Sequence, residues 1–131
     1  MRLAIISLAR APYWDLLYGA LDRTKGLTVR VFYLQPEDSV RGWSSPATSY
    51  DAVQFRCLTP EVLYSLPLLG VVNPGLTAAL ERFSPDCLLL HGYSYVTHLL
   101  VVRWAGRHGV PYLLWATPMP TSCARGVRFR R

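Results

Sequence analysis

The sequence predicts an α/β fold, a Rossmann-like parallel sheet with helices on both faces. Short, continuously apolar runs are typical of strands that are buried on both faces of a parallel sheet. Segments with apolar side chains at helical spacing alternate with these runs. The chain has 131 residues, of which 51% are hydrophobic and 17% charged, so it is long enough for one domain with a core and too apolar for a disordered chain.

The first half of the chain predicts a strand, a helix, a strand, a long loop and a weaker strand. Their ranges, in that order, are 3–8, 13–23, 27–34, 35–51 and 52–58. The first two strands are rich in β-branched residues, and the helix carries apolar side chains three and four residues apart until Gly26 ends it. The loop is polar and is interrupted by Pro36 and Pro46.

The second half predicts short helical turns with an apolar connector, followed by two helix–strand pairs. Their ranges are 59–72, 74–83, 86–90, 95–107 and 110–116. Asn73 and Ser94 are expected to cap the two helices, and Gly109 is expected to end the second one. His98 and His108 are expected on the surface or at the end of that helix.

The loops that follow the strands are the candidate functional regions, because ligands of parallel sheets bind beyond the carboxyl ends of strands, where the strand order reverses. These loops are residues 9–13, 35–50, 91–94 and 117–120. The first of them contains no glycine. A dinucleotide site needs glycines there so that backbone amides can approach a pyrophosphate, so we expect no nicotinamide or flavin cofactor.

The net charge of +6 is concentrated at the C-terminal end of the sequence. Four of the 14 Lys and Arg residues fall in the last seven positions, and all eight acidic residues lie before them, so residues 1–120 carry only +2. A nearly neutral body argues against a nucleic-acid partner. Residues 119–131 are expected to be a disordered basic tail.

The cysteines and the hydropathy pattern predict a cytoplasmic protein. Cys57, Cys87 and Cys123 are far apart and form no CxxC motif, which favours reduced thiols over disulfides or a zinc site. No stretch reaches the ~18 uninterrupted apolar residues of a membrane helix.

His91, Gly92, Tyr93 and Ser94 stand where a strand ends and a helix begins. An imidazole, a hydroxyl and free helix amides would therefore meet at one edge of a pocket, which suits hydrogen bonding to a polyol or a phosphate. The alternative is that His91 only satisfies a loop carbonyl. Cys87 shares a strand face with His91, as a nucleophile and its base or two metal ligands would, but no third ligand is visible and we expect no metal site.

Arg41 and Trp43 lie in the long loop, together with Tyr50. A cation and aromatic rings are the usual side chains for stacking on sugars or bases, and loops of this length are often functional. The same side chains could instead pin the loop to its own domain.

Residues 1–118 resemble the N-terminal, acceptor-side domain of GT-B glycosyltransferases of family 4. The matching landmarks follow one another along nearly the whole chain. They are Pro12-Tyr13 after the first strand, the Arg41 and Trp43 loop, Asn73-x-Gly75-Leu76, Phe83-Ser84-Pro85-Asp86, His91-Gly92-Tyr93-Ser94 and Gly109-Val110-Pro111. The order and spacing of these landmarks are specific, although no single one is.

Members of that family have two Rossmann-like domains that face a cleft. The resemblance implies that this chain is the first of them, an incomplete acceptor-side half of a GT-B fold. In the family the second domain holds the nucleotide-sugar through two glutamates with seven residues between them. Glu37, Glu61 and Glu81 do not have that spacing, and Trp115 to Pro118 stand where relatives often carry a catalytic histidine. No catalytic residue is therefore expected in this chain.

The resemblance thus implies the acceptor-binding half of a retaining, nucleotide-sugar-dependent glycosyltransferase, inactive without a donor domain. Its expected partners are a sugar or lipid-linked acceptor and, only through a separate donor domain, a nucleotide-sugar. The expected location is the cytoplasm, at the inner face of the membrane where the acceptor is lipid-linked. The expected contacts to acceptor or substrate are Pro12, Tyr13, Arg41, Trp43, His91, Gly92, Tyr93 and Ser94.

The alternative is a non-catalytic Rossmann-like binding or interaction module. Such a module would pair with a partner chain or with itself, through an exposed sheet edge or through the apolar residues 62–76. A peripheral membrane subunit is a variant of this alternative, because that connector is apolar.

Overall fold

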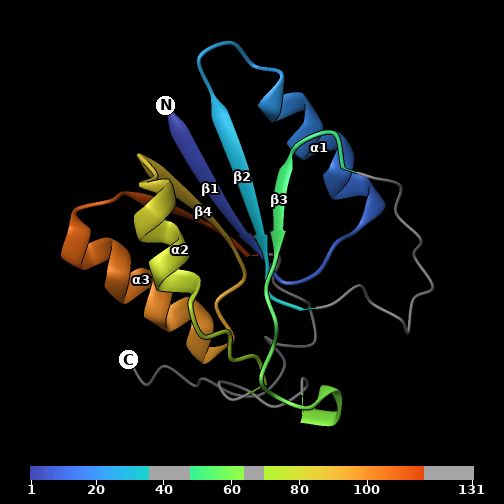
Figure 1. The fold of residues 1–131 in the computed structure, drawn as a ribbon, viewed down its shortest axis with the longest axis vertical. Coiled ribbons are helices and arrows are strands. Elements are labelled where there is room, and N and C mark those ends of the chain that lie inside the picture. Colours follow the sequence, from blue (N-terminus) through green and yellow to red (C-terminus); the bar gives the residue numbers. More distant parts are fainter. Residues whose placement is uncertain (36–47, 64–69, 117–131) are drawn as a thin grey trace, which may run out of the picture.

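The computed structural model describes residues 1–35, 48–63 and 70–116, which form one five-stranded sheet with helices on both faces (Figure 1). The strand order is β3-β2-β1-β4-β5, and every neighbouring pair is parallel. The strands are β1 Arg2–Ser7, β2 Thr28–Tyr33, β3 Asp51–Gln54, β4 Cys87–His91 and β5 Tyr112–Trp115. The Rossmann-like α/β class predicted from the sequence is confirmed.

The helices divide the core into two parts, one on each face of the sheet (Figure 1). Helix α1 (Pro12–Asp22) covers one face through the fully buried Tyr18. Helices α2 (Leu76–Phe83) and α3 (Val96–His108) cover the other through Leu80 and Trp104. Because side chains alternate along a strand, Ile5 faces α1 while Ile6 faces α2 and α3, and both are fully buried.

The strand order reverses between β1 and β4. The chain leaves β1 through α1 toward β2 on one side, and leaves β4 through α3 toward β5 on the other. The loops that follow β1 and β4 therefore diverge at the carboxyl edge of the sheet, which is the usual position of a ligand in this class of fold.

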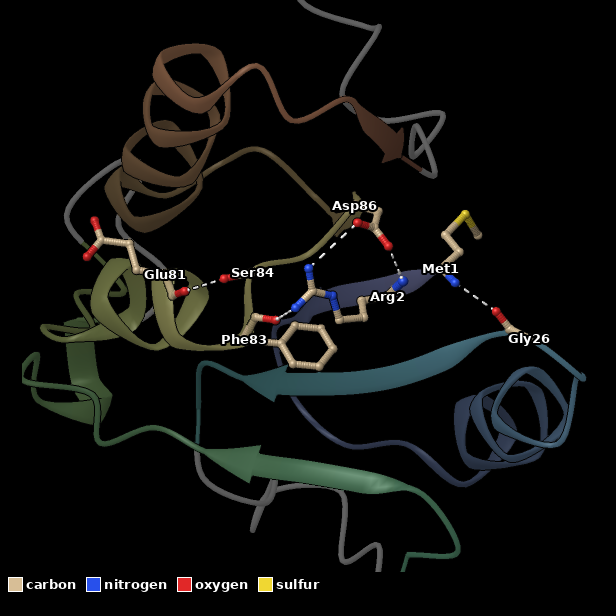
Figure 2. Close-up of polar contacts among 7 residues, drawn as sticks. All are labelled: Met1, Arg2, Gly26, Glu81, Phe83, Ser84 and Asp86. Carbon is tan, nitrogen blue, oxygen red and sulfur yellow. Dashed lines mark hydrogen bonds and ion pairs between the residues drawn. The ribbon is translucent and has the colours of Figure 1, made fainter.

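The opposite, amino edge is closed by contacts that tie the chain start to the α2–β4 turn (Figure 2). The Arg2 backbone N–H donates to Asp86 at 2.6 Å, and the Arg2 guanidinium donates to the Phe83 carbonyl at 3.2 Å. The Met1 ammonium donates to the Gly26 carbonyl at 2.8 Å. The side chains of Arg2 and Asp86 are about half exposed, so their ion pair adds little. The anchoring rests on these hydrogen bonds and on the one that the Asp86 backbone N–H donates to the Arg2 carbonyl at 2.8 Å.

Two helix starts differ from the expected caps. Helix α2 begins at Leu76, after Gly75 in a left-handed conformation with φ of 84°, and Asn73 does not cap it. The Asn73 amide is buried and donates instead to the carbonyls of Leu34 at 2.7 Å and Arg56 at 3.1 Å. Helix α3 begins after Tyr95, without a side-chain cap from Ser94.

Two further expectations from the sequence are corrected, namely the end of the third strand and the position of His98. Strand β3 ends at Gln54, so residues 55–58 extend beyond the sheet. Of the helical turns expected in 59–72, one is present among the described residues as the 3-10 turn Glu61–Leu63. His98 is buried at 2% exposure rather than lying on the helix surface, because α3 packs this side of its first turns against the sheet. Strand β5 is the last strand of the described sheet on this side and is exposed along its whole length.

Some expectations fall on parts of the chain that the structure does not describe. Arg41 and Trp43, the middle of the apolar connector (64–69) and the basic tail 119–131 lie outside the described residues. Within the described residues no helix is long and apolar enough to cross a membrane.

Candidate functional site

His91 is the last residue of β4 and stands at the carboxyl edge beside the point where the strand order reverses. It pairs in register with Trp115, the last residue of β5, so both side chains lie on the face of the sheet that α1 covers. Tyr18 comes from that helix and approaches His91 from above the sheet. Three elements therefore place aromatic rings around one imidazole.

The rings form an aromatic enclosure that consists of Trp14, Tyr18, His91 and Trp115. The centroid of the His91 ring lies 4.5 Å from that of Trp14 and 5.7 Å from that of Trp115. The two indoles meet edge-on at 5.3 Å and 85°, a preferred aromatic arrangement. Trp115 remains 47% exposed, so the enclosure opens to solvent on the β5 side.

The hydrogen bonding of His91 leaves one ring nitrogen without a partner. The Tyr18 hydroxyl lies 3.0 Å from Nδ1, and burial raises the pKa of Tyr18, so the phenol keeps its proton. Burial also lowers the pKa of His91 to about 4, so the ring is neutral at pH 7. With the phenol as donor to Nδ1, the ring proton sits on Nε2, which is buried and meets no partner among the described residues.

A chain of polar contacts beside the enclosure holds the neighbouring loops. Arg10, in the loop after β1, binds the Asp15 carboxylate of α1 through Nε at 3.0 Å and a terminal nitrogen at 2.9 Å. The Tyr50 hydroxyl donates to Asp15 and lies 2.7 Å from the Tyr33 hydroxyl at the end of β2. This arrangement, which we call the Arg10 clamp, joins the segment before β3 to α1 and β2.

The turn after β4 is shaped by Gly92 and lined by a second histidine. Gly92 has φ of 94°, and its N–H donates to the Trp115 carbonyl at 3.0 Å, which closes the turn against β5. The His98 ring stacks on Tyr95 at 5.9 Å. Burial lowers the pKa of His98 to about 4, an effect that the backbone of His91 partly opposes, and neither ring nitrogen reaches hydrogen-bond geometry with a described residue.

The structure brings together only some of the residues predicted from the sequence. His91 and Gly92 lie at the centre of the site, whereas Tyr93 and Ser94 are exposed on its rim. Pro12 is the first residue of α1, and Tyr13 next to it is 57% exposed with its ring 5.2 Å from that of Trp14. Cys87 shares the face of His91, but the described residues contain no group of three metal-ligating side chains.

Sequence reasoning did not assign Trp14, Tyr18 or Trp115 to the site. All three fit the apolar patterns of a helix and a strand, so they were indistinguishable from core residues. The available signal was the spacing of Trp14 and Tyr18, one helical turn apart directly after the loop that follows β1. That spacing places two rings with hydrogen-bonding groups above the carboxyl edge.

Comparison with known proteins supports the fold of this chain and does not show its function. No protein-family model and no curated protein matches the sequence. Among solved structures, the chain is similar to UDP-GlcNAc 2-epimerase from Neisseria meningitidis bound to UDP-GlcNAc, with a TM-score of 0.53 and 19% sequence identity. The similarity covers 94% of this chain and 34% of the epimerase chain, so the chain spans about a third of that protein's length.

Proposed function

We propose that this chain is the acceptor-binding half of a retaining, nucleotide-sugar-dependent glycosyltransferase and that it works together with a donor-binding domain. The observation that carries the proposal is the aromatic enclosure around the neutral His91 at the reversal of strand order. Similarity to an epimerase solved with UDP-GlcNAc gives further support, because that protein binds a nucleotide-sugar with a comparable fold.

The enclosure has the chemistry that sugars require. Indole rings such as those of Trp14 and the half-exposed Trp115 bind the apolar C–H face of a pyranose, while a few fixed polar groups orient its hydroxyls. A neutral imidazole supplies one donor and one acceptor, and at His91 the acceptor Nδ1 is already engaged by Tyr18. The Nε2–H is then the group from which a substrate hydroxyl would accept, once a neighbouring ring of the enclosure moves aside, because Nε2 is buried in this structure.

The same edge is poorly equipped to stabilise a departing nucleoside diphosphate. Among the described residues around the enclosure, the guanidinium of Arg10 is neutralised by Asp15. Burial keeps His91 uncharged at pH 7. Transfer of a sugar requires positive groups at the diphosphate as its charge develops, and we assign these to the donor domain.

The proposed acceptor is a sugar or a lipid-linked sugar, and the proposed location is the cytoplasm, at the inner face of the membrane for a lipid-linked acceptor. The test adds the chain to a nucleotide-sugar-binding domain of a retaining glycosyltransferase that lacks its own first domain. With a labelled nucleotide-sugar and a set of glycosides, we expect transfer only when both parts are present. His91→Gln should abolish transfer and His108→Gln, at the exposed end of α3, should leave it unchanged; equal turnover of the two variants would contradict the proposal.

A further inference from the structure

The start of α3 lies at the same carboxyl edge as the aromatic enclosure and carries uncommitted hydrogen-bond donors. The helix has 13 residues and begins at Val96 without a side-chain cap. The backbone N–H groups of Val96 and Thr97 stand too early in the helix for an intrahelical partner, and they meet no acceptor among the described residues. No acidic side chain stands in the first turn of α3 or in residues 87–95 before it. The positive end of the helix dipole therefore has no carboxylate of its own beside it.

A buried histidine lies in the turn that leads into α3. His98, in the first turn of the helix, is only 2% exposed, yet neither ring nitrogen has a hydrogen-bond partner among the described residues. Its ring stacks on Tyr95 with the centroids 5.9 Å apart, and Cε1 lies 3.9 Å from the point where a Cβ of Gly92 would stand. The ring therefore projects from the helix back into the turn. An unpaired buried polar ring costs free energy, which a ligand with hydrogen-bond acceptors would offset.

We propose that the start of α3 binds the phosphate of a glycosyl phosphate whose sugar ring lies in the aromatic enclosure. The inference rests on the proposed function and names its acceptor class, sugars that are joined to a lipid or another group through phosphate. Four groups there can donate to phosphate oxygens, namely the backbone N–H groups of Val96 and Thr97, the Ser94 hydroxyl and the His98 ring. Because the His98 nitrogens are buried, the ring meets the phosphate only when the turn shifts, so its signals report binding.

The position and the charge of these donors favour a phosphate on the acceptor over the diphosphate of a donor. His91 in the enclosure and Val96 at the helix start are separated only by the turn, so one sugar and its phosphate can span both. All the donors are uncharged, because burial lowers the pKa of His98 to about 4 and keeps its ring neutral at pH 7. Neutral donors suit a phosphate diester, whose charge does not change during transfer, whereas a departing diphosphate requires cations.

NMR titration of the full chain tests both parts of the ligand site. The signals followed are the backbone amides of Val96 and Thr97, the His98 ring, and the indoles of Trp14 and Trp115. The probes are glycosyl methyl phosphates of glucose, galactose and mannose, the corresponding methyl glycosides, inorganic phosphate and uridine diphosphate. We expect at least one diester to shift both groups of signals and to bind roughly tenfold or more tightly than its methyl glycoside. Inorganic phosphate should shift only the signals at the start of α3.

A charge variant tests the anion site without disturbing the core. Ser94→Asp places a carboxylate beside the start of α3 and should remove the preference for the diester over the methyl glycoside. The same carboxylate interacts favourably with the helix dipole, so thermal melting should show a fold at least as stable as that of the wild type. Ala78→Asp is the matched control, because it adds the same charge at an exposed position in the first turn of α2. This control should keep the preference for the diester.

The outcomes separate this inference from the proposed function. Equal affinities for every diester and its methyl glycoside, or an unchanged preference in Ser94→Asp, would overturn the phosphate site. Tighter binding of uridine diphosphate than of any diester would assign the anion to the sugar donor and also overturn it. Shifts of the two indoles alone would overturn the phosphate site and leave the proposed function standing. Shifts at the start of α3 alone would support the phosphate site and contradict the binding of a sugar in the enclosure.

Discussion

Lowering the pH from 7 to 5 should destabilise the fold, because two imidazoles are buried as neutral rings. Burial lowers the pKa of His91 and of His98 from 6.5 to about 4. In the unfolded chain both rings return to about 6.5 and bind protons more readily than in the fold. Above pH 6.5 the rings are neutral in both states and the free energy of unfolding is at its full value. It decreases as the pH falls from 6.5 toward 4, because the unfolded chain binds the protons more readily.

The magnitude follows from proton linkage. At pH 5 an unfolded-state pKa of 6.5 and a folded-state pKa of about 4 cost at most about 2 kcal/mol for each ring, and less for His91 because solvent screens this partly exposed ring. The two rings together cost at most about 4 kcal/mol, a large part of the stability of an ordinary domain.

Urea unfolding at pH 7 and pH 5 measures this difference, and His98→Gln divides it between the rings. Gln has no titration in this range, so the variant should keep only about half of the loss between the two pH values, whatever its stability at pH 7. His108→Gln, at the exposed end of α3, is the control and should keep the full loss. An equal loss in the wild type and in His98→Gln would refute the reasoning.

Three substitutions test other parts of the structure by urea or thermal unfolding. Asn73→Ala removes the donor to the buried Leu34 carbonyl and to the partly buried Arg56 carbonyl, and it should cost about 1–3 kcal/mol; a cost below about 0.5 kcal/mol would show that these carbonyls find other partners. Gly92→Ala should cost about 1–2 kcal/mol, because its φ of 94° is unfavourable for a residue with a Cβ. Gly106→Ala should stabilise the protein by about 0.5–1 kcal/mol, because this helical position has open space for a Cβ. A more stable Gly92→Ala than Gly106→Ala would contradict the backbone conformation described for Gly92. Tyr50→Phe leaves Asp15 without one of its donors and should cost about 1–3 kcal/mol; an unchanged stability would mean that the Arg10 clamp does not hold the segment before β3.

The order and type of the main elements could be predicted from the sequence because local patterns determine them. Residues 3–8 form a short apolar run with β-branched residues, which is typical of a strand covered on both sides. The helix over residues 12–22 repeats its apolar side chains at helical spacing. The predicted position of His91 at the end of a buried strand was correct for the same reason.

The details that failed depend on contacts between distant parts of the chain. Asn73 has the local pattern of a helix cap, but its amide is used by carbonyls that follow β2 and β3. Nothing near His98 in the sequence indicates that its side chain faces the sheet.

Only part of the candidate site could be predicted from the sequence, for a related reason. His91 was recognised through its position, but Trp14, Tyr18 and Trp115 become site residues only when α1 is folded over β4 and β5. The sheet register, which sets Trp115 beside His91, cannot be read from either strand alone.

The central claim is that a sugar binds in the aromatic enclosure, and the indole N–H signals of the four tryptophans test it most directly. Each signal is assigned with a Trp→Phe variant, and the protein is titrated with a set of simple alkyl glycosides as models of the acceptor. Trp14 and Trp115 should shift together and saturably, Trp104 on the opposite face should stay unchanged, and His91→Gln should remove the shifts. Unchanged Trp14 and Trp115 signals with every glycoside, or the same shifts in His91→Gln, would contradict the claim.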